Sequence, residues 1–221
     1  NINKILENKE SYGKKNSNNS YNIEFVSANP TGPMHVGHCR GAIYGDVLSN
    51  LLKFNGNKVT KEYYINDYGN QIINFAKSVF LRIREIKYNE KFTNEKNLYP
   101  GKYIINIGKK IIENYKDEAF DNFEKSLNVL KEYSLRYSMD LIKSDLKKLG
   151  IEHDNFFSET ELVKKKMVDK AINQLKKNNY VQEGFLEAPK GEIDKNWKKT
   201  KRLIFKSTLF GDDTDRAMQK D

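Results

Sequence analysis

Residues 24–41, Glu-Phe-Val-Ser-Ala-Asn-Pro-Thr-Gly-Pro-Met-His-Val-Gly-His-Cys-Arg-Gly, decide how this chain folds. A short apolar run over 21–27 predicts a buried strand, and the two prolines that follow lack the backbone donors that a strand needs. From His35 onward, apolar residues recur at three- and four-residue steps until Gly56, which is typical of a helix and its end. The stretch therefore predicts a strand, a tight turn and a helix N-terminus.

Strand and helix patterns continue to alternate beyond this stretch. Residues 59–65 indicate a second strand and residues 68–88 a second long helix. This order and spacing predict a parallel, right-handed α/β unit, with a largely helical insertion over about 89–150. The other predicted elements are a loop over 89–97, helices over 103–115, 120–149 and 161–178, strands over 155–158, 180–186 and 203–205, and a charged loop over 189–200.

The composition favours a polyanionic partner. The 221 residues carry 39 Lys and Arg against 30 Asp and Glu, and a net charge of +9 attracts polyanions at long range. Lysine-rich stretches such as 164–166 and 195–201 are more often plain solvated surface. The absence of an initiator Met, and of any tail-like signal at Asp221, indicates a chain truncated at both ends.

The number of cysteines and the hydropathy of the sequence indicate the cellular compartment of the protein. The single cysteine, Cys39, excludes an internal disulfide framework and fits a reducing compartment; we interpret it as a small buried helix residue, not a nucleophile. No run approaches the ~20 apolar residues of a membrane span. Residues 1–20 are too polar for a secretory leader. We therefore expect a cytoplasmic protein without a membrane partner.

The junction between the first strand and helix has the features of a phosphate site. In an α/β sheet, ligands bind at the carboxyl ends of strands, where a helix N-terminus offers free N–H groups and a positive dipole end. His35 and His38 are three residues apart and share one helix face, so both can stabilise charge on a phosphate. Gly37 between them would let an adenine or ribose approach the backbone.

This junction has three other interpretations. Gly32 and Gly37 have the spacing of a P-loop, but His38 and Cys39 occupy the positions that need Lys and Ser or Thr, which excludes that motif. Two histidines at this spacing make a poor zinc site, since His153 is the only other histidine. A plain helix N-terminus with two incidental histidines stays open.

The strings around this junction carry a family resemblance. His35-Val-Gly-His38 resembles the His-x-Gly-His signature of class I aminoacyl-tRNA synthetases, and residues 24–41 resemble the arginine-specific member. Tyr63-Tyr-Ile-Asn-Asp-Tyr-Gly-Asn-Gln71, Tyr99-Pro-Gly-Lys-Tyr103 and Phe210-Gly-Asp-Asp-Thr-Asp-Arg216 extend the resemblance to nearly the whole chain. It implies a Rossmann-like parallel sheet, with 1–20 as a remnant of the N-terminal region and 21–221 as the N-terminal part of the catalytic domain.

The resemblance also implies a two-step ligase chemistry. Arginine and ATP, accompanied by Mg²⁺ without ligands from protein side chains, would form arginyl-adenylate, and the 3′-terminal ribose of an arginine tRNA would capture it. His35 and His38 would contact the phosphates, with Gly37 beside them in the ATP site. Ser27 and Asn29 would hold the backbone end of arginine. A monomer is expected.

Glu24 is a candidate for the arginine side chain. A carboxylate inside an apolar strand is costly unless it is paired, and a guanidinium offers it two parallel hydrogen bonds. The resemblance assigns a glutamate at this position to the arginine pocket. A structural ion pair with a nearby Arg or Lys is the alternative.

Further polar and aromatic residues have weaker claims to a role. Asn66, Asp67 and Gln71 follow the second strand and could line the same cleft, although Asn66 or Asp67 could equally cap a helix. The aromatic residues that could stack on nucleic acid, but that are more often core, are Tyr63, Tyr64 and Trp197. The acidic residues that lack the other features of a calcium loop, and so receive no chemistry, are Asp212, Asp213 and Asp215.

Parts that the family needs are missing from this sequence. There is no Lys-rich second ATP loop of the KMSKS type, and we expect that loop, further arginine-pocket residues and the anticodon-binding domain beyond Asp221. The 221 residues alone are thus expected to be inactive or weakly active. Two alternatives are another nucleotidyltransferase of the same fold, specific for cysteine or pantetheine, and a non-catalytic RNA-binding module. The single cysteine argues against the cysteine-specific relatives, because those carry zinc-binding cysteines.

Overall fold

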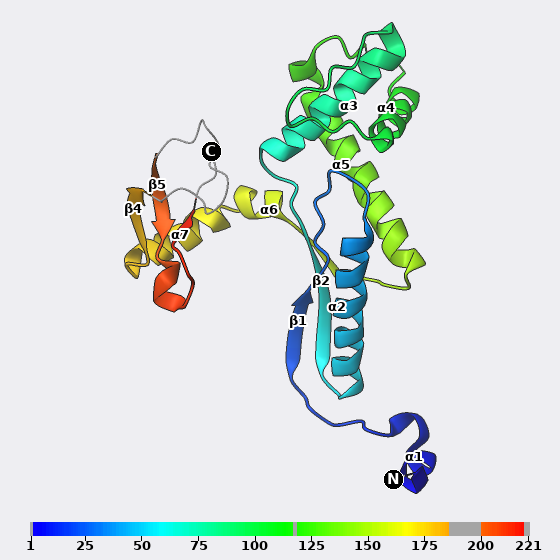
Figure 1. The fold of residues 1–221 in the computed structure, drawn as a ribbon, viewed down its shortest axis with the longest axis vertical. Coiled ribbons are helices and arrows are strands. Elements are labelled where there is room, and N and C mark those ends of the chain that lie inside the picture. The colour runs from blue at the N-terminus through cyan, green and yellow to red at the C-terminus, as the bar shows by residue number, and fades with distance from the viewer. Residues whose placement is uncertain (1, 117–118, 186–199, 219–221) are drawn as a thin grey trace. The chain divides into compact units, whose positions relative to one another are not determined.

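The computed structural model describes residues 2–116, 119–185 and 200–218, and the chain forms two compact units, Asn1–Glu161 and Leu162–Asp221 (Figure 1). The helices are α1 (Ile2–Asn8), α2 (Val36–Phe54), α3 (Asn70–Tyr88), α4 (Lys102–Asn114), α5 (Phe123–Lys148), α6 (Glu159–Lys164) and α7 (Met167–Lys177), with 3-10 turns at Lys9–Ser11 and Ser207–Phe210. The strands are β1 (Ser20–Glu24), β2 (Lys58–Ile65), β3 (Asn155–Ser158), β4 (Val181–Phe185), β5 (Lys201–Phe205) and β6 (Arg216–Ala217).

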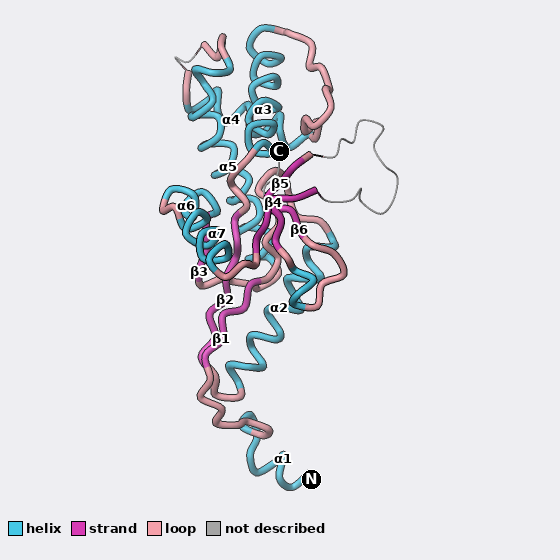
Figure 2. The backbone as a smooth tube through the Cα atoms, turned by 90° about the vertical axis from the view of Figure 1, so that its left-hand side faces the viewer, coloured by secondary structure: helices cyan, strands magenta, loops and turns pink. Residues whose placement is uncertain are grey.

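The first unit contains the predicted parallel sheet. Its strands lie in the order β1-β2-β3 (Figure 2). Glu24 lies opposite Glu62, and Glu62 lies opposite Asn155. Since all three strands run the same way, their carboxyl ends meet at one edge of the sheet, which is where an α/β sheet binds ligands. The parallel α/β prediction is confirmed.

The first strand differs from its prediction. It ends at Glu24 instead of residue 27, because Val26 and Ser27 adopt positive φ values of 68° and 40° that an extended strand cannot contain. Most of its side chains are exposed, so the prediction of a buried strand was wrong. Phe25, just after the strand, is the residue of this run that is buried.

Helix α2 packs on the sheet through small residues. Its buried positions are Ala42, Gly45 and Ser49, whereas Ile43 and Val47, which marked its periodicity, are about half exposed. A Cβ atom on Gly45 would lie 2.3 Å from the Phe25 ring, so only glycine lets the helix come this close to the end of β1. The periodicity predicted the helix correctly but did not identify the face that packs on the sheet.

A buried ion pair ties α2 to the central strand. Lys61 Nζ lies 2.6 Å from Asp46 Oδ1 and 3.2 Å from Asn50 Oδ1, and the two charged side chains are only 10% and 15% exposed. Pairing is what makes such burial tolerable, because an isolated charge there would be strongly disfavoured.

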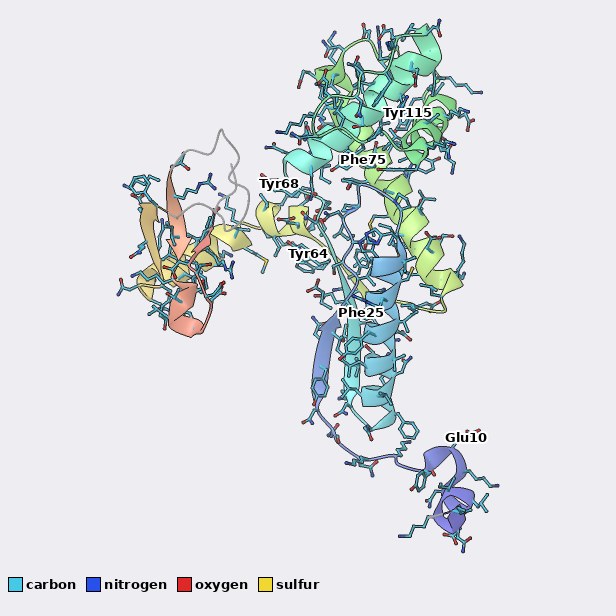
Figure 3. The ribbon with its side chains drawn as sticks, viewed as in Figure 1. Glu10, Phe25, Tyr64, Tyr68, Phe75 and Tyr115 are labelled. Carbon is cyan, nitrogen blue, oxygen red and sulfur yellow. The ribbon has the colours of Figure 1, made fainter. Side chains whose placement is uncertain are left out.

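The helices after β2 form a second core in the same unit. Figure 3 shows Phe75 of α3 among these helices and Phe25 where α2 meets the sheet. Helix α5 joins the two cores, since its N-terminal half packs on α3 and α4 and its C-terminal half reaches the sheet. The helical core consists of Phe75, Ala76, Val79, Ile83, Ile104, Ile107, Ile111, Phe120 and Leu130, and the core under the sheet of Phe25, Ala42, Tyr63, Met139, Ile142, Leu146 and Ile151.

The second unit corrects one prediction. The helix expected over 161–178 is two helices, α6 and α7, separated at Lys166, whose φ of 53° breaks the helical hydrogen-bond pattern. Strands β4, β5 and β6 form an antiparallel sheet, of which β6 was not predicted. Trp197 and the predicted loop up to residue 199 lie outside the described residues. None of the described helices has both the length and the apolar character required to cross a bilayer.

Candidate active site

The loop between β1 and α2 lies at the carboxyl edge of the parallel sheet. Ala28, Pro30 and Thr31 are buried, while Asn29 between them is exposed. The Tyr63 hydroxyl donates to the Ala28 carbonyl oxygen at 2.9 Å. Tyr63 is fully buried, so this residue has the core role that was weighed against base stacking.

The two histidines form a reciprocal cap on α2. His35 is the N-cap residue, and its Nδ1 accepts a hydrogen bond from the Gly37 N–H at 3.1 Å. In return the His35 N–H donates to His38 Nδ1 at 3.3 Å. The rings stack with centroids 3.7 Å apart and planes inclined by 22°. The prediction that the two imidazoles lie together at the helix start is confirmed.

This cap determines where each neutral ring carries its proton. Because Nδ1 accepts in both rings, the proton of the neutral imidazole must sit on Nε2. Neither Nε2 donates to any residue in the described ranges. Burial, and secondarily the nearby His35, lower the pKa of His38, which favours its neutral form. The site thus offers two Nε2–H donors beside a helix N-terminus.

The structure explains why position 37 is a glycine, which the sequence alone did not reveal. A Cβ atom at this position would lie 2.9 Å from His35 Cε1 and 3.1 Å from its Nδ1. The missing side chain therefore makes room for the capping ring of His35. The predicted approach of adenine or ribose to this backbone stays a prediction.

Glu24 stands at the end of β1, exposed and not buried as its sequence context predicted. Its Oε1 accepts a hydrogen bond of 2.5 Å from the Ser27 hydroxyl, which itself accepts from the Tyr64 N–H at 3.0 Å. Among the described residues, Glu24 forms no ion pair with an Arg or Lys, in contrast to the alternative that the sequence offers. Ser27 therefore orients a carboxylate that is left open to a cationic ligand.

The ends of β1 and β2 bring two amide side chains together. Asn66 Nδ2 donates to Asn29 Oδ1 at 3.2 Å, and Gln71 Nε2 donates to the Asn66 carbonyl oxygen at 3.1 Å. Asn29, Asn66 and Gln71 thus lie at one place, as their positions after the strands predicted. Asn66 does not cap α3, which begins after Gly69 without a side-chain cap.

Asp67 has a different task from its neighbours. Its Oδ2 accepts from the Ser158 hydroxyl at 2.6 Å and its Oδ1 from the Thr160 N–H at 2.8 Å. It therefore satisfies the start of α6, so the capping role weighed for it holds for a helix distant in sequence. Both carboxylate oxygens are engaged, which leaves Asp67 less open to a ligand than Glu24.

The site has one region that favours a cation and another that favours an anion. Burial, followed by the negative charges of Glu159, Asp67 and Glu24, raises the pKa of the Tyr64 phenol. The negative potential of these carboxylates near the Tyr64 phenol favours a cation such as a guanidinium. The imidazole donors and helix N-terminus suit an anion such as a phosphate.

The remaining candidates have surroundings of their own. Asp212 and Asp213 pair with Arg216, whose guanidinium holds the pKa of Asp212 well below its usual range. Cys39 is partly exposed. No group of three or more His, Cys, Asp or Glu side chains that could hold a metal ion occurs within residues 2–116, 119–185 and 200–218.

Known proteins share this architecture. The family model described as tRNA synthetases class I (R), catalytic domain, matches residues 1–186. The chain is 56% identical to the arginine–tRNA ligase of Pelagibacter ubique and 46% identical to that of Wolbachia sp. subsp. Brugia malayi, across 99% and 100% of its own length. It spans 38% and 39% of the length of these curated relatives.

A solved structure agrees with these relatives. A crystal structure from Campylobacter jejuni assigned to arginyl-tRNA synthetase superposes with a TM-score of 0.76 at 31% identity, covering 97% of this chain and 44% of that one. The parallel sheet, the paired histidines at the start of α2 and the family match together show that the chain belongs to the class I tRNA synthetases (R), in their catalytic domain.

Proposed function

We propose that this chain carries the part of an arginine–tRNA ligase that binds ATP and arginine. Residues 21–221 would form the N-terminal part of the class I catalytic domain, with the helical insertion over 89–150 and residues 1–20 belonging to the preceding region. The observation that carries the proposal is the reciprocal His35–His38 cap, because it presents two N–H donors at a helix N-terminus.

In the first step the histidines act on the phosphates of ATP. A carboxylate oxygen of arginine attacks the α-phosphorus, the bond to the bridging oxygen breaks, and pyrophosphate leaves with that oxygen. The Nε2–H groups of His35 and His38 donate to phosphate oxygens as charge builds on them. Mg²⁺ would neutralise the phosphates that it accompanies, without a cluster of protein carboxylates around it.

Arginine would lie at the acidic end of the site. Glu24, held by Ser27, accepts two hydrogen bonds from the guanidinium. Asn29, held by Asn66, contacts the backbone end of the amino acid. In the second step a 3′-terminal ribose hydroxyl of the tRNA attacks the carbonyl carbon of the adenylate, and AMP leaves. The protein would work as a monomer in the cytoplasm.

Arginine-dependent ATP–pyrophosphate exchange by the intact protein, with tRNA present, tests the proposal. Glu24→Gln should raise the KM for arginine about 10- to 100-fold, because it removes a charge-assisted pair. His35→Ala should lower kcat about 100-fold, the usual loss for one preorganised donor. The matched controls are Glu152→Gln and Leu51→Ala, both at exposed positions, which should leave the rates unchanged. Equal KM values for arginine in Glu24→Gln and wild type would refute the assignment of Glu24.

A further inference from the structure

The loop that carries Asn29 and leads into His35 is held in an unusual way. Apart from the turn at residues 30–31, no backbone group of residues 28–34 forms a further backbone hydrogen bond within the described chain. Its two prolines lack donors, so the loop cannot fix its own shape through a regular pattern. Two tyrosine hydroxyls hold it instead, Tyr63 at the Ala28 carbonyl and Tyr103 at the Thr31 carbonyl.

Tyr103 reaches this loop from the helical insertion. It is the second residue of α4, and its hydroxyl donates to the Thr31 carbonyl oxygen at 2.7 Å. Its ring packs against the helical core, and burial raises its pKa to about 12, so the phenol keeps its proton at neutral pH. A donor fixed in the insertion thus contacts the turn four residues before His35.

Two glycines make room for this contact. A Cβ atom on Gly32 would lie 3.1 Å from the Tyr103 hydroxyl oxygen, and one on Gly101 would lie 2.4 Å from the Tyr103 ring. Gly101 and Tyr103 belong to the Tyr99–Tyr103 string, and Gly32 belongs to the loop itself. Both sides of the contact are therefore shaped around one aromatic side chain.

We propose that Tyr103 is a positioning residue for the nucleotide site, through which the helical insertion fixes the loop between β1 and α2. The inference rests on the proposed function, since it assigns a task within that site. Without the Tyr103 hydroxyl, the buried Thr31 carbonyl loses its partner and the loop shifts to reach water. His35 and its cap follow the loop, and small displacements of a positioning group weaken its hold on the phosphates.

Tyr103→Phe in the intact protein tests this inference. It removes the hydroxyl and keeps the ring, and we expect kcat/KM for ATP in the exchange reaction to fall about fivefold, because the change acts through the His35 donor. Ile104→Val is the matched control, because it trims a fully buried neighbour in α4 that belongs to the helical core. It should shift the urea midpoint comparably without changing kcat/KM for ATP. An unchanged kcat/KM in Tyr103→Phe, or an equal fall in Ile104→Val, would overturn the inference.

A second measurement separates this inference from the proposed function. The carbonyl ¹³C resonance of Thr31 reports the hydrogen bond directly and needs no activity. Tyr103→Phe should shift this resonance and leave that of Ala28, which Tyr63 holds, in place. If the wild type were inactive but the Thr31 resonance shifted, the proposed function would be refuted, whereas the hydrogen bond between Tyr103 and Thr31 would still be supported. A Thr31 resonance that does not move would refute the positioning role whatever the activity.

Discussion

Gly37 shows at the scale of one residue how the site is built. A methyl group at this position would clash with the His35 ring, whereas glycine has only a hydrogen atom there. Gly37→Ala should displace that ring and break the reciprocal cap, which costs about 1 kcal/mol, while alanine returns a similar amount through helix propensity. We therefore expect nearly unchanged stability but a loss of about tenfold in kcat/KM for ATP.

A second glycine in the same helix provides the control for Gly37. A Cβ atom on Gly41 meets nothing within 4 Å, so Gly41→Ala should stabilise the protein by about 0.5–1 kcal/mol and leave catalysis intact. Urea unfolding and exchange kinetics measure both variants. Equal activities in Gly37→Ala and Gly41→Ala would show that the His35 ring position does not matter.

The residues of the site differed in how far their sequence context revealed them. The spacing of His35 and His38 was enough to predict that their rings lie together. Position after parallel strands likewise predicted that Asn29 and Asn66 converge. The task of Asp67 could not be predicted, because its partners Ser158 and Thr160 are more than 90 residues away and only the fold brings them close.

At the scale of elements, the contact between α2 and the end of β1 sets the geometry of the site. Gly45 lets the helix lie against Phe25, and Lys61 of β2 pairs with Asp46 one helix position further. Both contacts fix how α2, and with it the histidine cap, meets the sheet edge. Helix α2 is therefore positioned by small and polar residues on its inner face.

Gly45→Ala tests this packing. The added methyl group would overlap the Phe25 ring, so either the ring or the helix must move. We expect a destabilisation of about 1–3 kcal/mol, which is typical of overpacked cores, together with reduced activity. The free energy of urea unfolding, compared with that of Gly41→Ala, measures the effect. A Gly45→Ala protein as stable as wild type would contradict the close approach.

Periodicity predicted most elements but not their faces or ends. The strands β2 and β3 and the helices α3, α4 and α5 lie close to their predicted ranges. Strand β1 ends early because Val26 and Ser27 take left-handed backbone conformations, which no propensity of those residues indicates. The inner face of α2 is lined by Ala42, Gly45 and Ser49. The apolar pattern of the sequence includes Ala42, but a pattern of apolar residues does not register Gly45 and Ser49.

At the scale of the whole molecule, family membership and site chemistry support each other. The chain belongs to the catalytic-domain family, and the structure gives a physical reason for the residues of its His35–His38 string. The net charge of +9 fits a polyanionic partner such as the tRNA proposed here. The chain spans about two fifths of its curated relatives, so the experiments on activity concern the intact protein.

The central claim is that two imidazoles present Nε2–H donors to a nucleotide phosphate, and ¹⁵N NMR of the histidine rings tests it most directly. For His38 we expect a bare Nδ1 and a protonated Nε2 at pH 7, with a pKa below that of an ordinary histidine, because burial and the neighbouring His35 disfavour its charged form. Addition of Mg·ATP should move the Nε2 resonances of both His35 and His38. A proton on His38 Nδ1, or rings that do not respond to Mg·ATP, would contradict the account.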